Sequence, residues 1–432
     1  MSRLANGNGS SVPRSRTGFF VALAAKNLAR HRRRTIITSV AIAAGVAIFI
    51  WMFSILQGFE AENDRNMSRY ETGDAAIMGT GYWDERDTFP LDLLVEQPDR
   101  ILAALDDEGI PAAPRVGFRG ELIVRYDPFP EDGSLQRQFY GIDVERDQDV
   151  FALSDSIEEG RFLEAGNEEV IIGRWLADQL GAEVGYPISV TTRTRDGFHQ
   201  IMDLEIVGIF NTANPIVNRQ QAYLPIDIAD EYLEMRSAVT GIFLSLPGGL
   251  PAETDPGPVR ELLADVQGIE VLGFNRLNEE FAEFMEMENA ATAIILFLLA
   301  IIAIVGISNT MLMSVLEREN EIGMMRALGV REGEIRWMFM FEAAGIGVIG
   351  ALVGLGLGAL LVWYSVAIGI DYGALMEGVE MDFRFDEVLY GVWHVPSMIV
   401  TAVAAAVIAG VVALVPTRRM LKRRITDSLR HS

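Results

Sequence analysis

The chain has 432 residues, of which 50% are hydrophobic and 22% charged, and its formal net charge is −24 at pH 7. A mean hydropathy of +0.22 is too high for an ordinary soluble protein, and the charged fraction is too large for a chain embedded in lipid throughout. The absence of cysteine excludes disulfides and thiolate-bound metals, and the negative charge argues against nucleic acid as a partner. The composition therefore predicts membrane spans combined with a polar globular domain.

The charges are distributed unevenly along the chain. Residues 1–35 contain basic side chains and no acidic ones, and residues 417–432 are also strongly basic. Between them, residues 58–289 carry 47 acidic and 17 basic side chains. Since basic flanks mark the cytoplasmic side of a bilayer, both termini are predicted to lie inside and the acidic stretch outside.

The amino-terminal region precedes the first long apolar run. Residues 1–17 are rich in Gly, Ser, Asn and Arg and are predicted to be disordered. Residues 18–34 combine apolar and basic side chains, a pattern that favours an amphipathic cytoplasmic helix on the surface of membrane lipid. The uncharged run that follows would cover roughly 33 Å as a helix, so residues 35–57 are predicted as an uncleaved signal-anchor span.

Residues 58–289 have the composition of a globular domain. Short β-like runs alternate with helix-like runs and turn signals, which predicts an α+β extracytoplasmic domain inserted between the first and second spans. The predicted strands include Glu121–Tyr126, Gln138–Ile142, Val170–Ile172, Ile188–Thr192 and Asp203–Phe210, and the predicted helices are Leu91–Asp107, Arg174–Leu180, Asp227–Leu233 and Pro258–Val266.

Three further apolar segments predict three further transmembrane helices, four in all. They are residues 290–316, 337–370 and 395–416, with an acidic outer loop at residues 371–394 and a basic cytoplasmic tail at residues 417–432.

Two features inside these spans favour helix packing. Asn309 lies in the second span, where an asparagine usually bonds to a neighbouring helix, a reading we favour over a place on a substrate route. Gly350, Gly354 and Gly358 follow one another at steps of four residues in the third span and permit close helix contact. Their partner is either another helix of this chain or the same helix of a second copy.

The polar segment between the second and third spans, residues 317–336, is densely charged. Helical spacing puts Glu321 near Arg326, and Gly329 is a natural end for such a helix. The pattern is compatible with a solvated loop or with a short cytoplasmic coupling helix that docks into the groove of a partner. The candidate docking residues are Glu317, Arg318, Glu321, Ile322, Gly323, Met325, Arg326, Ala327, Leu328 and Gly329.

The less polar face of this segment is predicted to comprise Ile322, Met325 and Leu328. We expect these side chains to fill the partner's groove. Glu342, at the start of the next apolar run, is expected to pair with Arg318 or Arg326.

Motifs for catalysis and metal binding are absent from the sequence. It contains no Gly-x-x-x-x-Gly-Lys-Ser/Thr phosphate loop and no Gly-x-Ser-x-Gly elbow, and its four histidines are scattered. No catalytic, cofactor-binding or metal-binding residue is predicted, and the chain is not expected to be an enzyme.

The stretch Glu-Arg-x-x-Glu-Ile-Gly-x-x-Arg-Ala-Leu-Gly at Glu317–Gly329, followed by Glu342, resembles the signature of FtsX-like/MacB-like ABC transporter permeases. Ile425–Arg430 resembles the terminal motif of the same family more loosely, since Ser428 stands where other small residues are usual. Segments that resemble the MacB-like periplasmic core domain follow in one order: Glu159–Leu163, Glu169–Gly185, Leu204–Phe210 and Tyr223–Asp230.

The resemblance implies a multi-pass permease of the cell inner (cytoplasmic) membrane that dimerises with a second copy or a paralogue. It also implies a separate cytoplasmic ABC ATPase that binds ATP and Mg, and mechanotransmission from that ATPase to the extracytoplasmic domain. The implied functions are lipoprotein release or export of a lipophilic or peptide substrate, with a periplasmic carrier or fusion protein as a further candidate partner. The alternative is an FtsX-type signalling transducer that activates a periplasmic partner without transport, although such transducers usually carry smaller outer domains.

Overall fold

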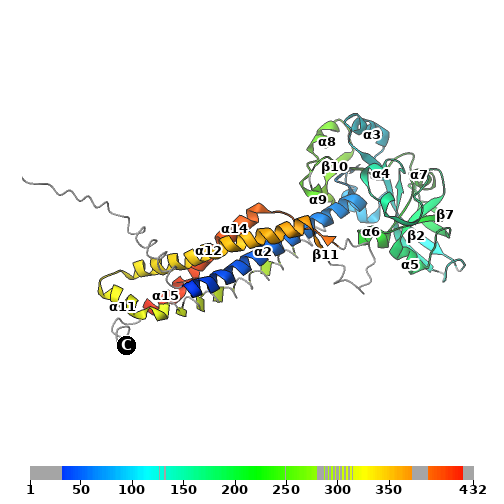
Figure 1. Ribbon diagram of the computed structural model, residues 1–432. Coiled ribbons are helices and arrows are strands. Elements are labelled where there is room, and N and C mark those ends of the chain that lie inside the picture. Colours follow the sequence, from blue (N-terminus) through cyan, green and yellow to red (C-terminus); the bar gives the residue numbers. More distant parts are fainter. Residues whose placement is uncertain are drawn as a thin grey trace, which may run out of the picture. The chain divides into compact units, whose positions relative to one another are not determined.

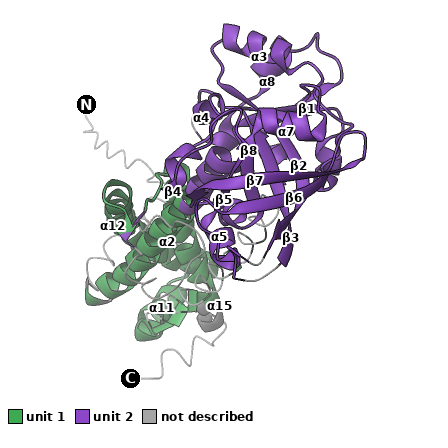
Figure 2. Cartoon of the chain, turned by 90° about the vertical axis from the view of Figure 1, so that its right-hand side faces the viewer, with its two compact units in different colours: residues 1–58, 287–370, 389–432 green, residues 59–286, 371–388 purple. Residues whose placement is uncertain are grey.

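The computed structural model describes two compact units, which Figure 2 shows in different colours. One unit contains residues 1–58, 287–370 and 389–432, and the other contains residues 59–286 and 371–388. The described residues are 32–125, 127–130, 133–248, 250–279, isolated positions between 287 and 313, 315–371 and 388–421.

The first unit is helical. Its described helices are α2 (Arg32–Met67, whose last turns belong to the other unit), α11 (Glu319–Ala327), α12 (Glu332–Ala367), α14 (Val395–Val412) and α15 (Leu414–Leu421). Within the described residues, three helices are long and apolar enough to cross a membrane: Thr35–Thr72, Glu332–Ala367 and Val395–Val412. The short strands β11 (Ile370–Asp371) and β12 (Val388–Leu389) flank the outer loop.

Several predicted segments lie largely or wholly outside the described residues. They are the amino-terminal segments 1–17 and 18–34, most of the second span 290–316, most of the outer loop 371–394 and most of the tail 417–432. The isolated described positions between 287 and 313 are helical.

Two helices extend beyond the predicted spans. Helix α2 continues to Met67 and ends in a π-helical turn, η1 (Ser68–Thr72), because polar residues past the apolar run still favour helix. Helix α12 begins at Glu332, before the predicted start of the third span. Its first turn is stabilised by Glu334, whose carboxylate accepts the Arg331 N–H at 3.0 Å.

The predicted glycine face of α12 contacts α2 of the same chain (Figure 1). A Cβ atom at Gly354 would lie 2.7 Å from the carbonyl oxygen of Ala43, and one at Gly350 would lie 2.8 Å from the Cβ of Ile42. Gly358 faces the same helix. Only glycine allows the two backbones to approach this closely, so the alternative that the sequence left open is resolved in favour of a helix of this chain.

Helix α14 packs on another side of α12. A Cβ atom at Gly347 would lie 2.8 Å from the Cβ of Ala409, so a small residue faces a small residue across this contact as well. The core of the three helices is apolar, and its buried members are Ile42, Val46, Ile50, Ile346, Val362, Met398 and Ala409.

The second unit is built around one ten-stranded sheet. Its order is β10-β1-β9-β2-β3-β8-β5-β7-β4, and β6 pairs with both β2 and β7. Strands β2, β3, β8, β5, β7 and β6 therefore form a closed ring. Outside the ring, β4 pairs with β7, and β9, β1 and β10 extend from the start of β2. The strands are β1 (Ala75–Gly79), β2 (Ala112–Val124), β3 (Gly133–Ile142), β4 (Ile157–Gly160), β5 (Glu169–Gly173), β6 (Pro187–Arg193), β7 (His199–Phe210), β8 (Gln221–Pro225), β9 (Gly241–Leu244) and β10 (Ile269–Gly273).

Short helices connect the strands, which confirms the predicted α+β content. They are α3 (Pro98–Asp107), α4 (Asp147–Val150), α5 (Arg174–Leu180), α6 (Pro215–Gln220), α7 (Ile226–Leu233), α8 (Gly257–Leu262) and α9 (Phe274–Leu277), with 3-10 turns η2 (Trp83–Thr88), η3 (Ser154–Ser156) and η4 (Pro251–Glu253). The predicted helix Leu91–Asp107 is shorter in the structure, because Pro98 fits the first turn of a helix but not its interior.

Candidate functional site

The polar segment at residues 317–336 contains helix α11, which lies just before α12 in the chain. Gly329 follows the helix with a φ of 87°, a left-handed conformation that glycine adopts without strain. The Val330 N–H then donates to the carbonyl of Met325 at 3.1 Å and turns the chain toward α12. Gly329 thus ends the helix as predicted. Docking of this helix into the groove of a partner remains a prediction.

One face of α11 is buried against α12. Ile322 is 3% exposed and packs in a core with Ile335 and Phe339 of α12, and Met325 lies partly buried against the same core. The predicted docking face is therefore corrected, because Ile322 and Met325 point inward. A nine-residue helix is too short to be stable alone, so its apolar stripe covers its own neighbour first.

Two other apolar side chains of this segment are exposed. Leu328 is 85% exposed and Met324 is 55% exposed, and both lie on the same side of the helix at a spacing of four residues. Gly323 is buried, whereas Glu317, Ala327 and Gly329 are exposed. Sequence reasoning did not include Met324, although its four-residue spacing from Leu328 was the signal that could have found it.

Arg318 connects the start of α11 to α12. Its Nη1 lies 3.0 Å from Glu342 Oε2, and its Nε lies 2.9 Å from Glu321 Oε2. The Arg318 and Glu342 side chains are only 11% and 5% exposed, and the guanidinium carbon lies 5.9 Å from the centre of the Phe339 ring. The predicted pairing of Glu342 with Arg318 is confirmed, and this buried pair holds the two helices at one point.

The other charges of the segment are paired differently from the prediction. Glu321 was expected beside Arg326, but its salt bridge is to Arg318, and Arg326 forms a salt bridge of 3.1 Å with Glu332 of α12. Glu332 also lies 3.4 Å from Arg336. Arg326 therefore fixes the carboxyl end of α11 as Arg318 fixes its amino end.

Asn309 is helical and exposed in the single chain. Its predicted packing against a neighbouring helix remains a prediction.

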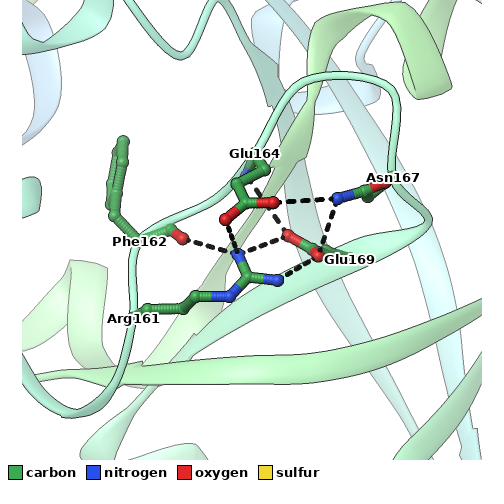
Figure 3. Close-up of polar contacts among 5 residues, drawn as sticks. All are labelled: Arg161, Phe162, Glu164, Asn167 and Glu169. Atoms are coloured by element: carbon green, nitrogen blue, oxygen red, sulfur yellow. Dashed lines mark hydrogen bonds and ion pairs between the residues drawn. The ribbon is translucent and has the colours of Figure 1, made fainter.

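A second motif region lies in the outer domain, at the loop between β4 and β5 (Figure 3). Glu169 is only 7% exposed. Its carboxylate accepts hydrogen bonds from both terminal nitrogens of Arg161, from the Asn167 side chain and from the Glu164 N–H. Burial raises the pKa of Glu169, but the hydrogen bonds from Arg161, the Glu164 N–H and Asn167, together with the positive charge of Arg161, outweigh this effect and hold the pKa below its usual range.

Gly160, which precedes this arginine, has a φ of 78°, and a Cβ there would lie 2.1 Å from the carbonyl oxygen of Val207. Leu163 is buried. The Glu-Gly-Arg-Phe-Leu motif therefore serves the folding of this loop. Its glycine adopts a left-handed backbone conformation, its arginine binds the Glu169 carboxylate, and its leucine is buried in the domain.

Two protein-family models match the chain. The MacB-like periplasmic core domain matches residues 35–256, and the FtsX-like permease C-terminal domain matches residues 293–425. The chain belongs to the FtsX-like/MacB-like family of ABC transporter permeases, whose members work with ATPase partners and whose permease homologues are inner-membrane proteins.

The relatives include proteins with two different printed functions. The lipoprotein-releasing system transmembrane protein LolC of Neisseria meningitidis is 27% identical over 417 residues, which cover 92% of this chain and 94% of LolC. The macrolide export ATP-binding/permease protein MacB 2 of Aeromonas hydrophila is 24% identical over 83% of this chain, and the match spans only 54% of that protein. An ABC transporter permease of Methanocaldococcus jannaschii is 23% identical over 82% of this chain and 86% of its own length.

Among solved structures, the periplasmic region of MacB from Actinobacillus actinomycetemcomitans matches with a TM-score of 0.34 and 14% identity, covering 48% of this chain and 92% of that chain.

Proposed function

We propose that this chain is a permease subunit that transmits ATPase-driven motion across the inner membrane to its extracytoplasmic domain. The observation that carries the proposal is the attachment of α11 to α12 by the buried Arg318–Glu342 pair, with Met324 and Leu328 left exposed on the outer side of α11. A force applied to the exposed face would pass through the pair and the Ile322 core into the spanning helix α12.

The exposed face of α11 suits a protein partner better than a lipid surface. Its two apolar side chains are flanked by charges of both signs, which gain little from anionic lipid but can complement a patterned protein groove. We propose that a separate ABC ATPase, which binds ATP and Mg, occupies this face. The permease would have four spans and cytoplasmic termini and would work as a dimer with a second copy or a paralogue.

We further propose lipoprotein release as the substrate class. LolC is named as part of a lipoprotein-releasing system, and the match covers nearly the full length of both chains. The MacB relative is named for macrolide export, but the chain spans about half of it. Release of a lipid-anchored substrate needs extraction from the outer leaflet, a task that suits motion of an outer domain.

The test of the docking face is Leu328→Asp. Placing a carboxylate at this exposed position should leave the chain inserted in the membrane, weaken co-purification with the ATPase and abolish substrate-stimulated ATP hydrolysis. Leu262→Asp, at a partly exposed leucine of the outer domain, is the matched control. Full ATPase association of the Leu328→Asp complex would place the coupling surface elsewhere.

Transport is tested separately from docking. The permease is reconstituted with its ATPase in vesicles that carry a fluorescent lipoprotein, and release into solution is measured with ATP present. A complex that hydrolyses ATP and releases no lipoprotein, but activates a periplasmic hydrolase, would favour the signalling transducer.

A further inference from the structure

The outer domain contains a groove that the proposed function does not use. The groove has a volume of about 510 Å³ and lies between α3, the start of β2, the start of α7 and the residues just before β9. It is within the size range of pockets that bind small molecules or the side chains of a peptide.

The floor of the groove is apolar and its rim is acidic. Leu102, Val116 and Val239, all largely buried, form part of the floor. Five aspartates and one arginine also line the groove, and they come from three separate parts of the sequence: Asp99, Asp106, Asp143, Arg146, Asp227 and Asp230. An apolar body that carries positive charges would match both surfaces.

The arginine that lines the groove is already paired with one of the aspartates. Arg146 donates two hydrogen bonds to Asp106, of 3.0 and 2.8 Å, and these hydrogen bonds hold the pKa of Asp106 below its usual range. Asp143 accepts backbone N–H groups of the following turn, and Asp230 accepts the N–H of Ser237 at 2.7 Å. These bonds hold the two carboxylates in place at the rim.

The other two aspartates are available to a ligand. Asp99 and Asp227 are exposed, and among the described residues neither has a hydrogen-bond or ion-pair partner. Asp99 lies in the first turn of α3 and Asp227 in the first turn of α7. The groove therefore has free carboxylates on two different helices with an apolar floor adjoining both.

A metal ion does not suit this arrangement. Within the part of the chain that the structure describes, no three His, Cys, Asp or Glu side chains come close enough to hold one. Separated carboxylates require separated positive charges, and an apolar floor would add nothing to ion binding.

We propose that the groove binds a short peptide that carries at least two basic side chains and apolar side chains between them. The apolar residues would cover the floor, and the basic residues would reach Asp99 on one side and Asp227 on the other. The proposal does not depend on ATPase docking at α11 or on lipoprotein release.

The test uses the full-length chain in detergent and a fluorescent six-residue peptide of alternating lysine and leucine. Fluorescence anisotropy should show saturable binding that weakens as salt is raised, since exposed charges are screened. A peptide with glutamate in place of lysine should not bind, and one with serine in place of leucine should bind at least tenfold more weakly.

Two variants place the peptide in the groove. Asp99→Asn/Asp227→Asn should weaken binding tenfold or more, whereas Asp155→Asn/Asp265→Asn, two exposed aspartates that do not line the groove, should not. Ala103→Trp, at an exposed position of α3 that lines the groove, should block it without changing its charge.

Three results would overturn the proposal. The first is peptide binding that is unchanged in both groove variants. The second is an equal loss of peptide affinity in the groove aspartate pair and in the control aspartate pair. The third is that an apolar amine with a single charge binds as tightly as the peptide, which would mean that the two carboxylates do not bind the peptide together. The unfolding temperature of each variant is measured as well. If it equals that of the wild type, a loss of binding is due to the changed groove and not to unfolding.

Discussion

The buried Arg318–Glu342 pair should be the most sensitive point of the coupling segment. The two side chains are 11% and 5% exposed, so an unbalanced charge left there is poorly solvated. Removing one member of a buried pair typically costs about 3–5 kcal/mol. We therefore predict that Arg318→Gln destabilises the helical unit by about 3–5 kcal/mol, because it leaves the Glu342 carboxylate without its arginine.

Removing the other member of the pair should destabilise the helical unit less. In Glu342→Gln, Arg318 keeps its 2.9 Å salt bridge with Glu321, whose side chain is 44% exposed and can adjust. We expect a loss of about 1–3 kcal/mol, the range for an unmet buried hydrogen-bonding group. The swapped pair Arg318→Glu/Glu342→Arg should recover part of the stability, although Glu321 would then face a like charge.

The assay is thermal unfolding of each full-length variant in the same detergent, together with ATPase stimulation of the assembled complex. The double-mutant cycle then isolates the interaction between the two side chains. Glu321→Gln is the matched control, since it removes an exposed carboxylate from the same arginine. If Arg318→Gln and Glu321→Gln are equally stable and equally stimulated, the pair does not hold α11 to α12 and the coupling argument fails.

Two further predictions rest on the structure, and a third rests on the charge pattern of the sequence. Gly354→Leu should disrupt folding of the helical unit because its side chain would enter α2, while Gly356→Leu, which meets nothing within 4 Å, should be tolerated, as measured by the monodisperse yield in detergent. The pKa of Glu169 is lowered in the folded state, so its stabilisation is present above the usual glutamate pKa of about 4.3 and is lost as the pH falls below it. Glu169→Gln should therefore lower the unfolding temperature at pH 7, and its difference from the wild type should shrink as the pH is lowered below about 4.3; a difference that does not change with pH would contradict this. A cysteine introduced at Ser428 should resist an impermeant reagent in intact cells, and its labelling would contradict the predicted cytoplasmic carboxyl terminus.

Local patterns in the sequence were sufficient for several features of the fold. The glycine repeat at Gly350, Gly354 and Gly358 predicted close helix packing, because small residues at steps of four leave one face of a helix flat. The repeat could not identify the partner helix. That choice depends on Ala43 and its neighbours, which lie far away in the sequence and carry no matching signal of their own.

The groove of the outer domain could not be predicted from the sequence at all. Asp99, Asp143 and Asp227 are ordinary acidic residues in an acidic domain, and nothing in their spacing connects them. They share one rim only because α3, α7 and the end of β3 meet around β2. A site assembled from single residues of distant elements has no local motif, so only the fold could bring it into view.

The position of helix α11 was predicted correctly, but the face that it buries was not, and the reason is physical. Helix α11 has apolar residues on two faces, Ile322 and Met325 on one and Met324 and Leu328 on the other. Periodicity shows that both faces exist, but it does not show which one the protein itself covers. The face that is buried depends on α12, because its apolar side chains Ile335, Met338 and Phe339 also have to be shielded from solvent. Because α11 is joined to α12 by a short turn, its nearer apolar face is used for this cover, and only the other face remains for a partner.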